Sequence, residues 1–585
     1  MSNSNHKAST KSSYASPYPS LQALQQILPK LPKDCKKIPI YKELYADFIT
    51  PIVALALLKS QCANVFLLES MQDRKQWGRY SFLGLNPSAH FSCVKDIVRI
   101  ESSNKKILDL AKFGHKILSN KRQNKQHIVE FKASPKEILR KVLKMYKSPN
   151  LAQFGLNNIP SFSGGLVGYF AYDYIGLIEK KLDFKANKNI KNTTKDIEVM
   201  LFDSLIVFDN LAQKLLLLTN IDIDIRTKNP KQKLSNAYKQ GIKKLESIEK
   251  ILYQNQAIKM QDLQGFRLDS PIKSYYDKRG FCSIVERAKH YIKEGDIFQV
   301  VLSNPLKANA SGSLFDVYRV LRTSNPSPYM FYLSSKKLEI AGASPETLLK
   351  LENGVIYTYP LAGSRPRGST IEQDEKLATE LLNDEKELSE HNMLVDLGRN
   401  DIGKVAKIGS VKVEQYQNIV RYSHIMHISS RVSGILRKDK DALSVLDSIF
   451  PAGTLSGAPK IRACEIIYEL ENHKNNKTNR GIYGGAIGYL DFSGNMDMCI
   501  GIRLAVKQDN KVLVRSGAGI VYDSDGEKEF IETQNKAKAV INALEIASQN
   551  SCNLNIWRDS PNLKNPHFSR KDCKIYQKKV RKNKK

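Results

Sequence analysis

The chain has 585 residues and a formal net charge of +32, with 41% hydrophobic and 26% charged residues. That composition is too apolar for a chain that is disordered throughout, and the length suffices for two or more domains. The longest apolar runs, such as Pro51–Leu58 and Leu215–Leu218, fall short of the ~18 residues of a membrane-spanning helix, so a membrane span is excluded. The eight cysteines are scattered without CxxC pairs or zinc-ligand spacing, which is typical of reduced thiols in an intracellular protein.

The positive charge is concentrated outside the longest part of the chain. Residues 1–33, 105–147, 226–259 and 551–585 together carry +30, whereas residues 260–550 carry only +2. We expect five regions, namely a disordered extension over 1–39, an N-terminal domain over 40–225, a basic connector over 226–264, a second domain over 265–548 and a lysine-rich tail over 549–585. The Ser-rich, acid-free start resembles a plastid transit peptide but lacks Arg, so a plain extension and a cytoplasmic location are expected, with a plastid location as the alternative.

The second domain opens with helical periodicity over 281–293 and continues with a strand-like segment over 297–303. A long helix is predicted over 372–397, and Gly398 is expected to end it. A last helix is predicted over 527–546. Long helices therefore separate the strand-rich parts of this domain.

Three strands are predicted between residues 483 and 522, with turns at 493–495 and 509–510. Such short connections require antiparallel pairing. The expected fold class is therefore α+β, with large antiparallel sheets flanked by helices, rather than a doubly wound parallel sheet.

Generic nucleotide and metal motifs fail when their spacing is checked. The glycine-rich segment 453–460 has no Gly-Lys-Ser/Thr in register and is not a P-loop, and Gly517–Gly519 lacks the third glycine of a dinucleotide fingerprint. His424 and His427 lie in a strand-like segment and would point to opposite faces, which disfavours a shared metal.

Two predicted helices each carry a pair of carboxylates on one face. The pairs are Glu387 with Glu390 and Glu529 with Glu532, both at a spacing of three residues. Two solvated helix faces explain this spacing, and so does a Mg²⁺ ion that takes one carboxylate from each helix and leaves its other positions to water and an anionic substrate. The spacing alone leaves both interpretations open.

Other segments suit an anionic ligand. Arg503 lies in an apolar segment that is expected to be a strand, where its charge needs either a structural ion pair or an anionic ligand as its partner. Gly517-Ala518-Gly519 offers either exposed backbone N–H groups or a crowded strand contact. The residues alone therefore favour an anion-binding α+β enzyme with a possible magnesium site.

A set of longer motifs resembles the chorismate-utilising enzymes, and within them the large subunits of anthranilate synthases. The motifs occur in the family's order over about 40–548, and they are GASPETLLK, PLAGSRPRG, DEKELSEHNMLVDLGRNDIG, YSHIMHISSRVSG, AGTLSGAPKIRACEII, GIYGGAIGYL, MCIGIRLAV and GAGIVYDSDGEKEFIETQNKA. LLES at 67–70 and GGLVGYFAYD at 164–173 extend the resemblance into the N-terminal domain. The resemblance implies the fold of that family, with a chorismate-binding catalytic domain over 265–548.

The resemblance implies that chorismate receives ammonia at C2 and loses its C4 hydroxyl, which gives 2-amino-2-deoxyisochorismate and then anthranilate and pyruvate. It implies Mg²⁺ as cofactor, with Glu390 and Glu532 as ligands and Glu387 and Glu529 beside them. The residues implied to bind chorismate are Gly363, Ser364, Tyr483, Arg503, Gly517, Ala518 and Gly519.

The resemblance also implies catalytic roles. Glu346 matches the general acid that protonates the departing hydroxyl, which requires a raised carboxyl pKa, and His427 matches a histidine that assists the elimination or orients the substrate. Gln299 stands where water-adding relatives carry a Lys base, which favours ammonia as the nucleophile. Ala362 stands where aminodeoxychorismate synthases carry Lys, which disfavours that rival activity.

The resemblance implies a partner and an inhibitor. The chain has no cysteine in a glutaminase context, so ammonia is expected from a glutamine amidotransferase subunit (component II) in a heterotetramer of two of each, or from free ammonium. Feedback inhibition by L-tryptophan is implied at Ser70, Pro328, Tyr329 and Met330. A nucleic-acid-binding protein is the rival from another class, but the basic segments are poor in aromatics and no nucleic-acid partner is expected.

Overall fold

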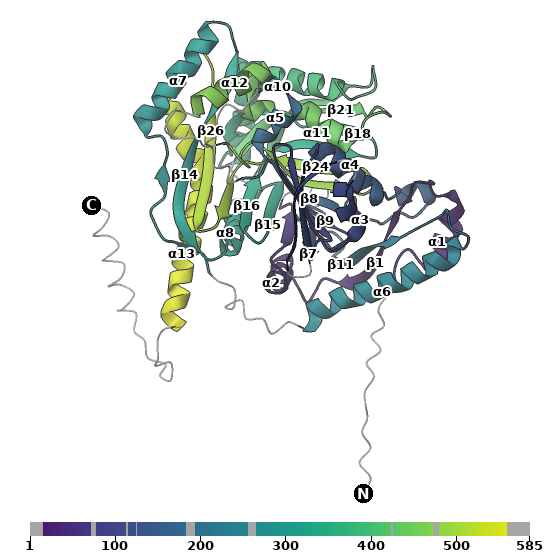
Figure 1. Ribbon diagram of the computed structural model, residues 1–585. Helices are drawn as coiled ribbons and strands as arrows, with labels where there is room; N and C mark the ends of the chain where they lie inside the picture. The colour runs from purple at the N-terminus through teal and green to yellow at the C-terminus, as the bar shows by residue number, and fades with distance from the viewer. Residues whose placement is uncertain are drawn as a thin grey trace.

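The computed structural model describes residues 16–558 except for 72–77, 113–114, 124–125, 183–193, 255–264, 423–424 and 472–478. Two large antiparallel sheets face each other in this part of the chain, and helices cover their outer surfaces (Figure 1). The helices of the described residues are α1 Leu21–Ile27, α2 Pro51–Gln61, α3 Lys105–Leu108, α4 Pro135–Met145, α5 Ile175–Ile178, α6 Pro230–Gln254, α7 Lys278–Lys293, α8 Phe315–Ser324, α9 Ile371–Leu382, α10 Glu385–Gly403, α11 Ala442–Ile449, α12 Lys460–Glu471 and α13 Gly526–Arg558. The expected α+β class with large antiparallel sheets is confirmed.

The first sheet runs from β1 at one edge to β12 at the other, and two short strands, β13 and β22, pair with β14. In spatial order its strands are β1 Lys37–Tyr45, β11 Lys214–Asp222, β10 Ser204–Asp209, β3 Tyr80–Leu85, β2 Val65–Glu69, β15 Tyr329–Ser334, β16 Leu338–Ser344, β25 Leu504–Gln508, β26 Lys511–Ile520, β14 Gln299–Ser311 and β12 Arg267–Leu268, with β13 Lys273–Ser274 and β22 Gly457–Ala458 off this path. Leu215–Ile221 in β11 are all buried, because one face of the sheet packs on helices and the other on the second sheet.

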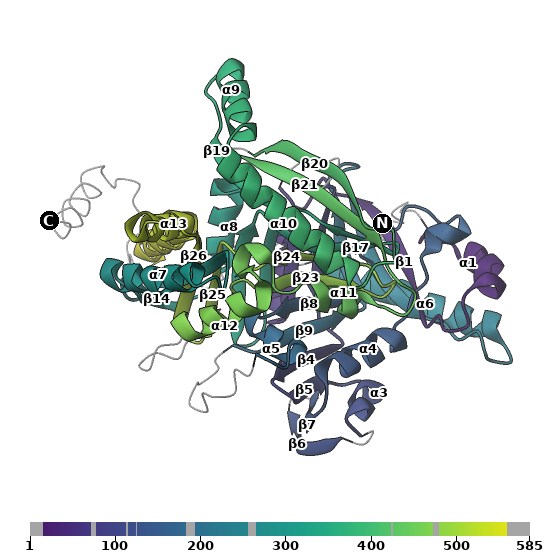
Figure 2. The ribbon, with the colours of Figure 1, turned by 90° about the horizontal axis from the view of Figure 1, so that it is seen from above.

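The second sheet runs from β19 to β6, and β20 pairs with β21 beside it. In spatial order its strands are β19 Leu361–Pro366, β21 Ile425–Ile435, β18 Val355–Thr358, β17 Thr347–Glu352, β24 Met496–Ile500, β23 Ala486–Asp491, β8 Gly165–Phe170, β9 Ile197–Phe202, β4 Ala89–Val94, β5 Ile97–Ser102, β7 Gln126–Lys132 and β6 Lys116–Gln123, with β20 Lys412–Arg421 off this path. Figure 2 shows α10 and α11 over this sheet and α9 standing out from the body, whereas α12 packs on β14 of the first sheet.

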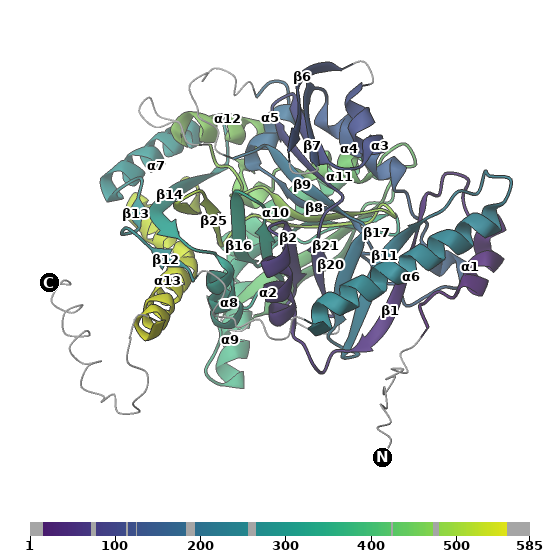
Figure 3. The same ribbon diagram turned by 60° about the horizontal axis from the view of Figure 1, so that its bottom comes forward.

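Aromatic side chains fill the space between the two sheets. Phe66 of β2 meets Phe202 of β9 edge to face at 4.8 Å between ring centroids, and Phe331 and Tyr489 belong to the same core cluster. Aromatic pairs in such tilted arrangements stabilise a core beyond their buried area. On the outside of the first sheet, α2, α6, α8 and α13 share another core cluster and lie along one face of the molecule (Figure 3).

Both sheets contain strands from the two regions that we expected to be separate domains. The first sheet joins residues 40–225 to 265–548 where β2 pairs with β15, and the second sheet joins them where β8 pairs with β23. The two regions therefore share their hydrophobic cores rather than each having its own.

The flanking regions also differ from the expectation. Residues 1–39 were expected to form a disordered extension, but α1 and the chain after it bury Leu24, Leu28 and Leu31 in the core under the first sheet. Residues 226–264 were expected to form a connector, but α6 buries Leu245 and Leu252 against that sheet. Its many lysines lie on the other side of the helix, which hides the apolar stripe in a count of charge. Residues 1–15 and 559–585, which include most of the predicted tail, lie outside the described part of the chain.

The predicted helix over 372–397 is two helices. α9 ends at Leu382, and α10 begins after Asp384, whose carboxylate accepts hydrogen bonds from the N–H groups of Lys386 and Glu387 and so caps a new helix. Gly398 does not end the second helix, which continues to Gly403.

The predicted three-stranded segment is four strands. β24 pairs with β17 and β23 in the second sheet, whereas β25 pairs with β16 and β26 in the first. The chain crosses between the sheets at Gly501–Arg503, so Arg503 lies in a bend and not within a strand. Its φ of 48° is a left-handed conformation that a non-glycine residue adopts rarely.

Candidate active site and a second cavity

Glu346 is a half-buried carboxyl group between β16 and β17. Its Oε1 accepts a hydrogen bond of 2.8 Å from the Thr454 hydroxyl, and its backbone oxygen accepts one of 3.0 Å from the N–H of Ile500. Burial raises the pKa of Glu346 to about 7, although the Thr454 hydrogen bond and the charges of Lys536 and Arg503 act in the opposite direction. A carboxylic acid that is partly protonated at neutral pH suits a general acid, which is the role expected for Glu346.

Arg503 faces this carboxyl group from the bend between the sheets. Among the described residues, no hydrogen bond or ion pair engages its guanidinium group, and Glu346 and Tyr422 contribute the charges that act on it. Burial lowers the pKa of Arg503, but a guanidinium group stays charged in proteins. A half-buried cation of this kind is available to an anionic ligand.

His427 lies on β21 with its ring oriented by the backbone of the neighbouring strand. Its Nδ1 is 2.8 Å from the carbonyl oxygen of Gly363, so Nδ1 carries the proton and Nε2 is left as an acceptor. Burial lowers the pKa of His427, and the charge of Arg503 lowers it further, so the ring is neutral at pH 7. The neutral ring can therefore take up a proton at Nε2.

Gly363 and Ser364 form an irregular step in β19, where the register with β21 shifts between Ala362 and Arg365. Gly363 has a φ of 65°, and a Cβ at this position would lie 3.1 Å from Oε2 of Glu387. The Ser364 residue is exposed. This step brings the predicted substrate loop next to the carboxylate pair of α10.

The three residues Gly517-Ala518-Gly519 lie on β26 opposite Ser303, Leu302 and Val301 of β14. The other edge of β26 is paired with β25 only as far as Val514, so no strand covers it beside these residues in the described chain. Ala518 is fully buried. The uncovered edge can present backbone N–H groups to an anion.

The two glycines of this segment allow side chains to approach the strand closely. The Tyr483 hydroxyl is 2.7 Å from the position that a Cβ at Gly517 would take, and Nε2 of Gln299 is 2.8 Å from the corresponding position at Gly519. Burial raises the pKa of Tyr483, so its hydroxyl remains a hydrogen-bond donor. The structure thus brings Tyr483, Gln299 and the glycine segment together.

The carboxylate pairs lie near the N-terminal ends of α10 and α13. Nε2 of Gln299 donates to Oε1 of Glu390 at 3.2 Å, which links α10 to β14. Burial and then the charge of Glu390 raise the pKa of Glu387. Like-charge repulsion of this kind favours either a proton or a cation between the two carboxylates.

The pair on α13 is similar, except that Glu532 is exposed and Lys536 binds it with 2.6 Å between Nζ and Oε1. Burial and, to a smaller extent, the charge of Glu532 raise the pKa of Glu529. The Ser524 hydroxyl donates a hydrogen bond of 2.9 Å to Oε1 of Glu529. No group of three or more metal-ligating side chains occurs in the described residues. The donor set therefore suits only a cation that takes most of its ligands from water and substrate, as Mg²⁺ does.

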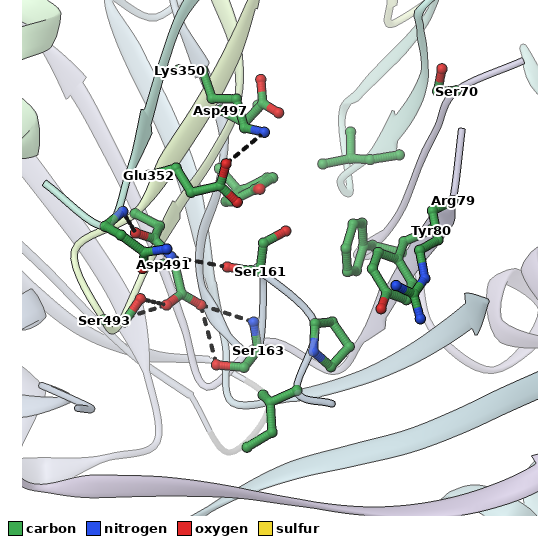
Figure 4. Close-up of a pocket in the computed structure, with 18 of the residues that line it drawn as sticks. Ser70, Arg79, Tyr80, Ser161, Ser163, Lys350, Glu352, Asp491, Ser493 and Asp497 are labelled. Carbon is green, nitrogen blue, oxygen red and sulfur yellow. Dashed lines mark hydrogen bonds and ion pairs between the residues drawn. The ribbon is translucent and has the colours of Figure 1, made fainter. Parts of the chain in front are cut away.

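A separate cavity of about 540 Å³ lies between the sheets, where residues of β2, β3, β15, β17, β23 and β24 line it. Ser70, Pro328, Tyr329 and Met330, the four residues expected at an inhibitor site, all line it, and we call it the Tyr329 cavity. Figure 4 shows one side of it as acidic, while Ser70, Arg79 and Tyr80 lie across from that side. The acidic and basic groups on the first side are Lys350, Glu352, Asp491 and Asp497.

Several residues at these sites were not predicted from the sequence. Thr454, which holds Glu346, lies in the motif AGTLSGAPKIRACEII, but no role was expected for Thr454 itself. Asp497 and Glu69 line the Tyr329 cavity and interrupt apolar strands. A carboxylate within a buried strand was the available signal, because burial of a charge requires a partner. His424 lies outside the described residues.

No helix among the described residues is long and apolar enough to cross a membrane. Six of the eight cysteines, at positions 35, 62, 93, 282, 464 and 499, are free thiols. Burial raises the pKa of Cys35 to about 11, and it also raises the pKa of Cys93 and Cys499. These three thiols therefore remain protonated and are unreactive at neutral pH.

Comparisons with known proteins agree with this arrangement. A family model described as chorismate binding enzyme matches residues 95–542. Anthranilate synthase component 1 of Acetivibrio thermocellus is 40% identical over 536 residues, covering 88% of this chain and 97% of the relative, and that of Aquifex aeolicus is 42% identical over 521 residues, covering 89% and 97%.

Among solved structures, anthranilate synthase component I from Streptococcus pneumoniae superimposes with a TM-score of 0.63 at 33% identity, covering 85% of this chain and 98% of that one. The fold therefore agrees with the sequence relatives over most of the chain. On this basis the chain belongs to the chorismate-binding enzymes, in the branch of anthranilate synthase component 1.

Proposed function

We propose that this chain is the large subunit of an anthranilate synthase and catalyses the first step of tryptophan biosynthesis. Ammonia adds to C2 of chorismate as the C4 hydroxyl leaves as water, which gives 2-amino-2-deoxyisochorismate. Elimination of pyruvate then makes the ring aromatic and gives anthranilate. The observation that carries the proposal is the half-buried Glu346. Its pKa is raised to about 7, and its carboxyl group faces the guanidinium group of Arg503, which makes no hydrogen bond or ion pair with the described residues.

In this proposal Glu346 donates the proton that converts the departing C4 hydroxyl into water. Hydroxide is a poor leaving group, so a positioned acid with a pKa near the working pH accelerates this step. Thr454 binds Oε1 of Glu346, so the transferable proton is on Oε2. A neutral His427 takes up a proton at Nε2 during the elimination of pyruvate.

The carboxylates of chorismate would be bound by groups for which the described residues provide no other hydrogen-bond partner. Arg503 supplies a cation, the Tyr483 hydroxyl supplies a donor, and the uncovered edge of Gly517–Gly519 supplies backbone N–H groups. Gly363 and Ser364 border the site beside Glu387. Hydrogen bonds to an ionised group are stronger than those between neutral groups, which suits a dicarboxylate substrate.

Glu390 and Glu532 would hold a Mg²⁺ ion, with Glu387 and Glu529 beside them. Bound Mg²⁺ would neutralise and orient the ring carboxylate of the substrate. Lys536 now neutralises Glu532 and would have to move aside for the ion.

Ammonia would act as the nucleophile without a basic side chain. Gln299 is a neutral amide that donates to Glu390 and cannot deprotonate water. We propose that a glutamine amidotransferase subunit delivers the ammonia, because the relatives are named as component 1 of a synthase and such a name implies a second component. The assembly that we propose contains two subunits of each kind. Free ammonium is the alternative source.

L-Tryptophan would bind in the Tyr329 cavity and inhibit the enzyme. The cavity volume of about 540 Å³ lies within the ~300–1,000 Å³ range of small-molecule sites. Its carboxylates suit the α-ammonium group of an amino acid, and its aromatic side chains suit an indole ring. The inhibitor and substrate sites are thus distinct, as allosteric inhibition requires.

The main test is the incubation of the purified chain with chorismate, Mg²⁺ and ammonium at mildly alkaline pH, followed by anthranilate fluorescence. Anthranilate should form, and a chelator should abolish its formation. The absence of anthranilate, or the formation of aminodeoxychorismate in its place, would refute the proposal. A DNA-binding assay on the same preparation tests the rival class, for which the net charge of +32 is the only argument.

The inhibitor assignment has its own test. Ser70→Phe fills the rim of the Tyr329 cavity and should raise the tryptophan concentration needed for half-inhibition. An active Ser70→Phe variant with the tryptophan sensitivity of the unaltered chain would contradict the assignment.

A further inference from the structure

Three charged side chains form a buried cluster behind the glycine segment of β26. Arg480, Glu471 and Arg515 are only 3%, 4% and 4% exposed. Glu471 Oε1 is 2.6 Å from Nη2 of Arg480, and its Oε2 is 3.0 Å from Nη1 of Arg515. Charges buried to this extent normally balance one another, because an unpaired buried charge is costly.

This cluster connects the chain segments that carry the proposed substrate site. Arg480 donates to the backbone oxygens of Leu455 and Val301, both at 2.6 Å. Glu471 Oε1 accepts from the N–H and the hydroxyl of Ser303, at 2.8 and 2.9 Å. Breaking these contacts would therefore affect several parts of the site at once.

Each of these contacts lies within a few residues of a proposed functional group. Leu455 follows Thr454, which holds Glu346, and Val301 pairs with Gly519. Arg515 precedes Gly517 by two residues on β26. The Arg480 guanidinium carbon is 5.9 Å from the centre of the Tyr483 ring.

Within the described part of the chain, the cluster consists of two arginines and one glutamate, which is an excess of positive charge. Tyr172 packs under Arg480 with 4.5 Å between the guanidinium carbon and the ring centre, and burial keeps its hydroxyl neutral by raising its pKa. Asp173 is a further carboxyl group on which the charges of both arginines act. Burial raises its pKa to about 7, so it compensates the excess only in part at neutral pH.

We propose that Arg480, Glu471 and Arg515 are positioning residues whose excess positive charge strengthens the binding of the chorismate carboxylate at Tyr483 and Gly517. They do not touch the substrate in this assignment. They act by holding β26 and Tyr483 in place and through the electrostatic field of the excess positive charge. The inference rests on the proposed substrate site, because the field matters only if an anion binds there.

The direction in which chorismate affinity changes distinguishes this electrostatic role from a purely structural one. Arg515→Gln removes a cation but leaves the Arg480 contacts with Leu455, Val301 and Glu471 in place, whereas Glu471→Gln removes the anion. We expect chorismate affinity to fall about tenfold in Arg515→Gln and to stay equal or rise in Glu471→Gln. Arg515→Lys keeps the charge and should restore most of the affinity.

The measurement is calorimetric titration of chorismate with Mg²⁺ but without ammonium, so that no amination occurs, alongside kcat, KM and thermal unfolding. Glu339→Gln is the matched control, because Glu339 forms a largely buried ion pair with Lys59 at 2.5 Å in another part of the first sheet. The control should leave chorismate affinity unchanged.

A decrease of affinity in both Arg515→Gln and Glu471→Gln would overturn the proposal and assign the cluster a structural role. If Glu471→Gln does not fold, the decision rests on Arg515→Lys, and a failure of this variant to restore affinity or to fold also overturns the proposal. An unaltered chain that binds chorismate but forms no anthranilate would refute the proposed function and leave this test intact.

Discussion

Two half-buried carboxyl groups, Glu346 in the candidate active site and Asp497 in the Tyr329 cavity, make an instructive comparison. Burial raises the pKa of both, to about 7 and about 6. Asp497 has a local environment that satisfies it, since it accepts a 2.8 Å hydrogen bond from Tyr329 and faces the charge of Lys350. Glu346 has only the Thr454 hydroxyl, and the Arg503 that faces it makes no hydrogen bond with the described residues. Among the described residues, the guanidinium group of Arg503 thus has no hydrogen bond, whereas Asp497 already has a donor in Tyr329 and keeps acceptor positions for a further one.

The two regions are nevertheless joined by short covalent and hydrogen-bonded connections. The hydroxyl groups of Tyr329 and Thr347 are 3.0 Å apart, and Thr347 directly follows Glu346. β24 carries Asp497 near its start, and at its end the N–H of Ile500 donates to the backbone oxygen of Glu346. A ligand that moves Tyr329 can therefore displace Glu346, because Tyr329 contacts both Thr347 and β24, and each of these is connected directly to Glu346.

The largest expected effect comes from removing the acid itself. Glu346→Gln keeps the shape of the side chain but cannot donate the proton, so kcat for anthranilate formation should fall by ~10²- to 10⁴-fold. The affinity for chorismate should change much less. Steady-state kinetics with Glu375→Gln on the exposed surface of α9 as the control tests this, and a kcat near that of the control would exclude Glu346 as the acid.

The second prediction concerns the unpaired cation. Arg503→Gln removes the charge that we assign to a chorismate carboxylate, so KM for chorismate should rise by about 10- to 100-fold, in line with ~1.5–3 kcal/mol for a hydrogen bond to a charged group. The thermal stability should hold or improve, because a costly buried charge is lost. Arg399→Gln on α10, where Arg399 pairs with Asp396 at the surface, is the control. An unchanged KM in Arg503→Gln would contradict the assignment.

Arg503 also shows what could and could not be predicted from the sequence. The motifs that carry Glu346, His427, Gln299 and Gly517–Gly519 indicated a common site, and the fold places these residues near one another. The bend at Arg503 was missed because apolar residues flank it on both sides, as in one continuous strand. The break occurs where β24 ends its pairing in the second sheet and β25 begins its pairing in the first. The partner strands are distant in sequence, so the local residue pattern does not reveal the break.

The flanking regions were misread for a different physical reason. In α6, Leu245, Ile248 and Leu252 form a helical stripe that packs on the first sheet, but the lysines between them led to the expectation of a solvated connector. Leu24 and Leu28 near the N-terminus were likewise hidden in a Ser-rich context. A short apolar stripe predicts a buried helix only when the surface on which the helix packs is known.

The third prediction tests the paired carboxylate. Tyr329→Phe removes the hydrogen bond that lowers the pKa of Asp497, so this pKa should rise and more of the carboxyl group should be neutral at pH 7. A neutral Asp497 attracts the ammonium group of tryptophan less. A rise of this pKa from about 6 to about 7 would lower the ionised fraction at pH 7 from about 0.9 to about 0.5, so the tryptophan concentration for half-inhibition should rise about twofold.

The matched control for this variant is Tyr291→Phe, which removes a 2.7 Å hydrogen bond between a tyrosine and Glu469 at the surface. Its inhibition curve should coincide with that of the unaltered chain. Equal curves for Tyr329→Phe and Tyr291→Phe would show that the Tyr329 contact with Asp497 does not contribute to inhibition. A basal kcat lowered only by Tyr329→Phe would instead report the contact with Thr347.

The smallest expected effect is a shift in pH dependence. The proposed acid acts in its protonated form, so kcat/KM should decrease as the pH rises through about 7, the pKa of Glu346. The Thr454 hydrogen bond stabilises the ionised form and lowers that pKa, so its removal in Thr454→Val should raise the pKa and move the alkaline limb to higher pH. The shift of the midpoint should be about 0.5 to 1, which corresponds to one ordinary hydrogen bond. Thr379→Val on α9 should leave the profile in place. A limb that stays fixed in Thr454→Val would mean that another group sets the pH dependence, and a limb that moves to lower pH would mean that the hydroxyl stabilises the protonated acid instead.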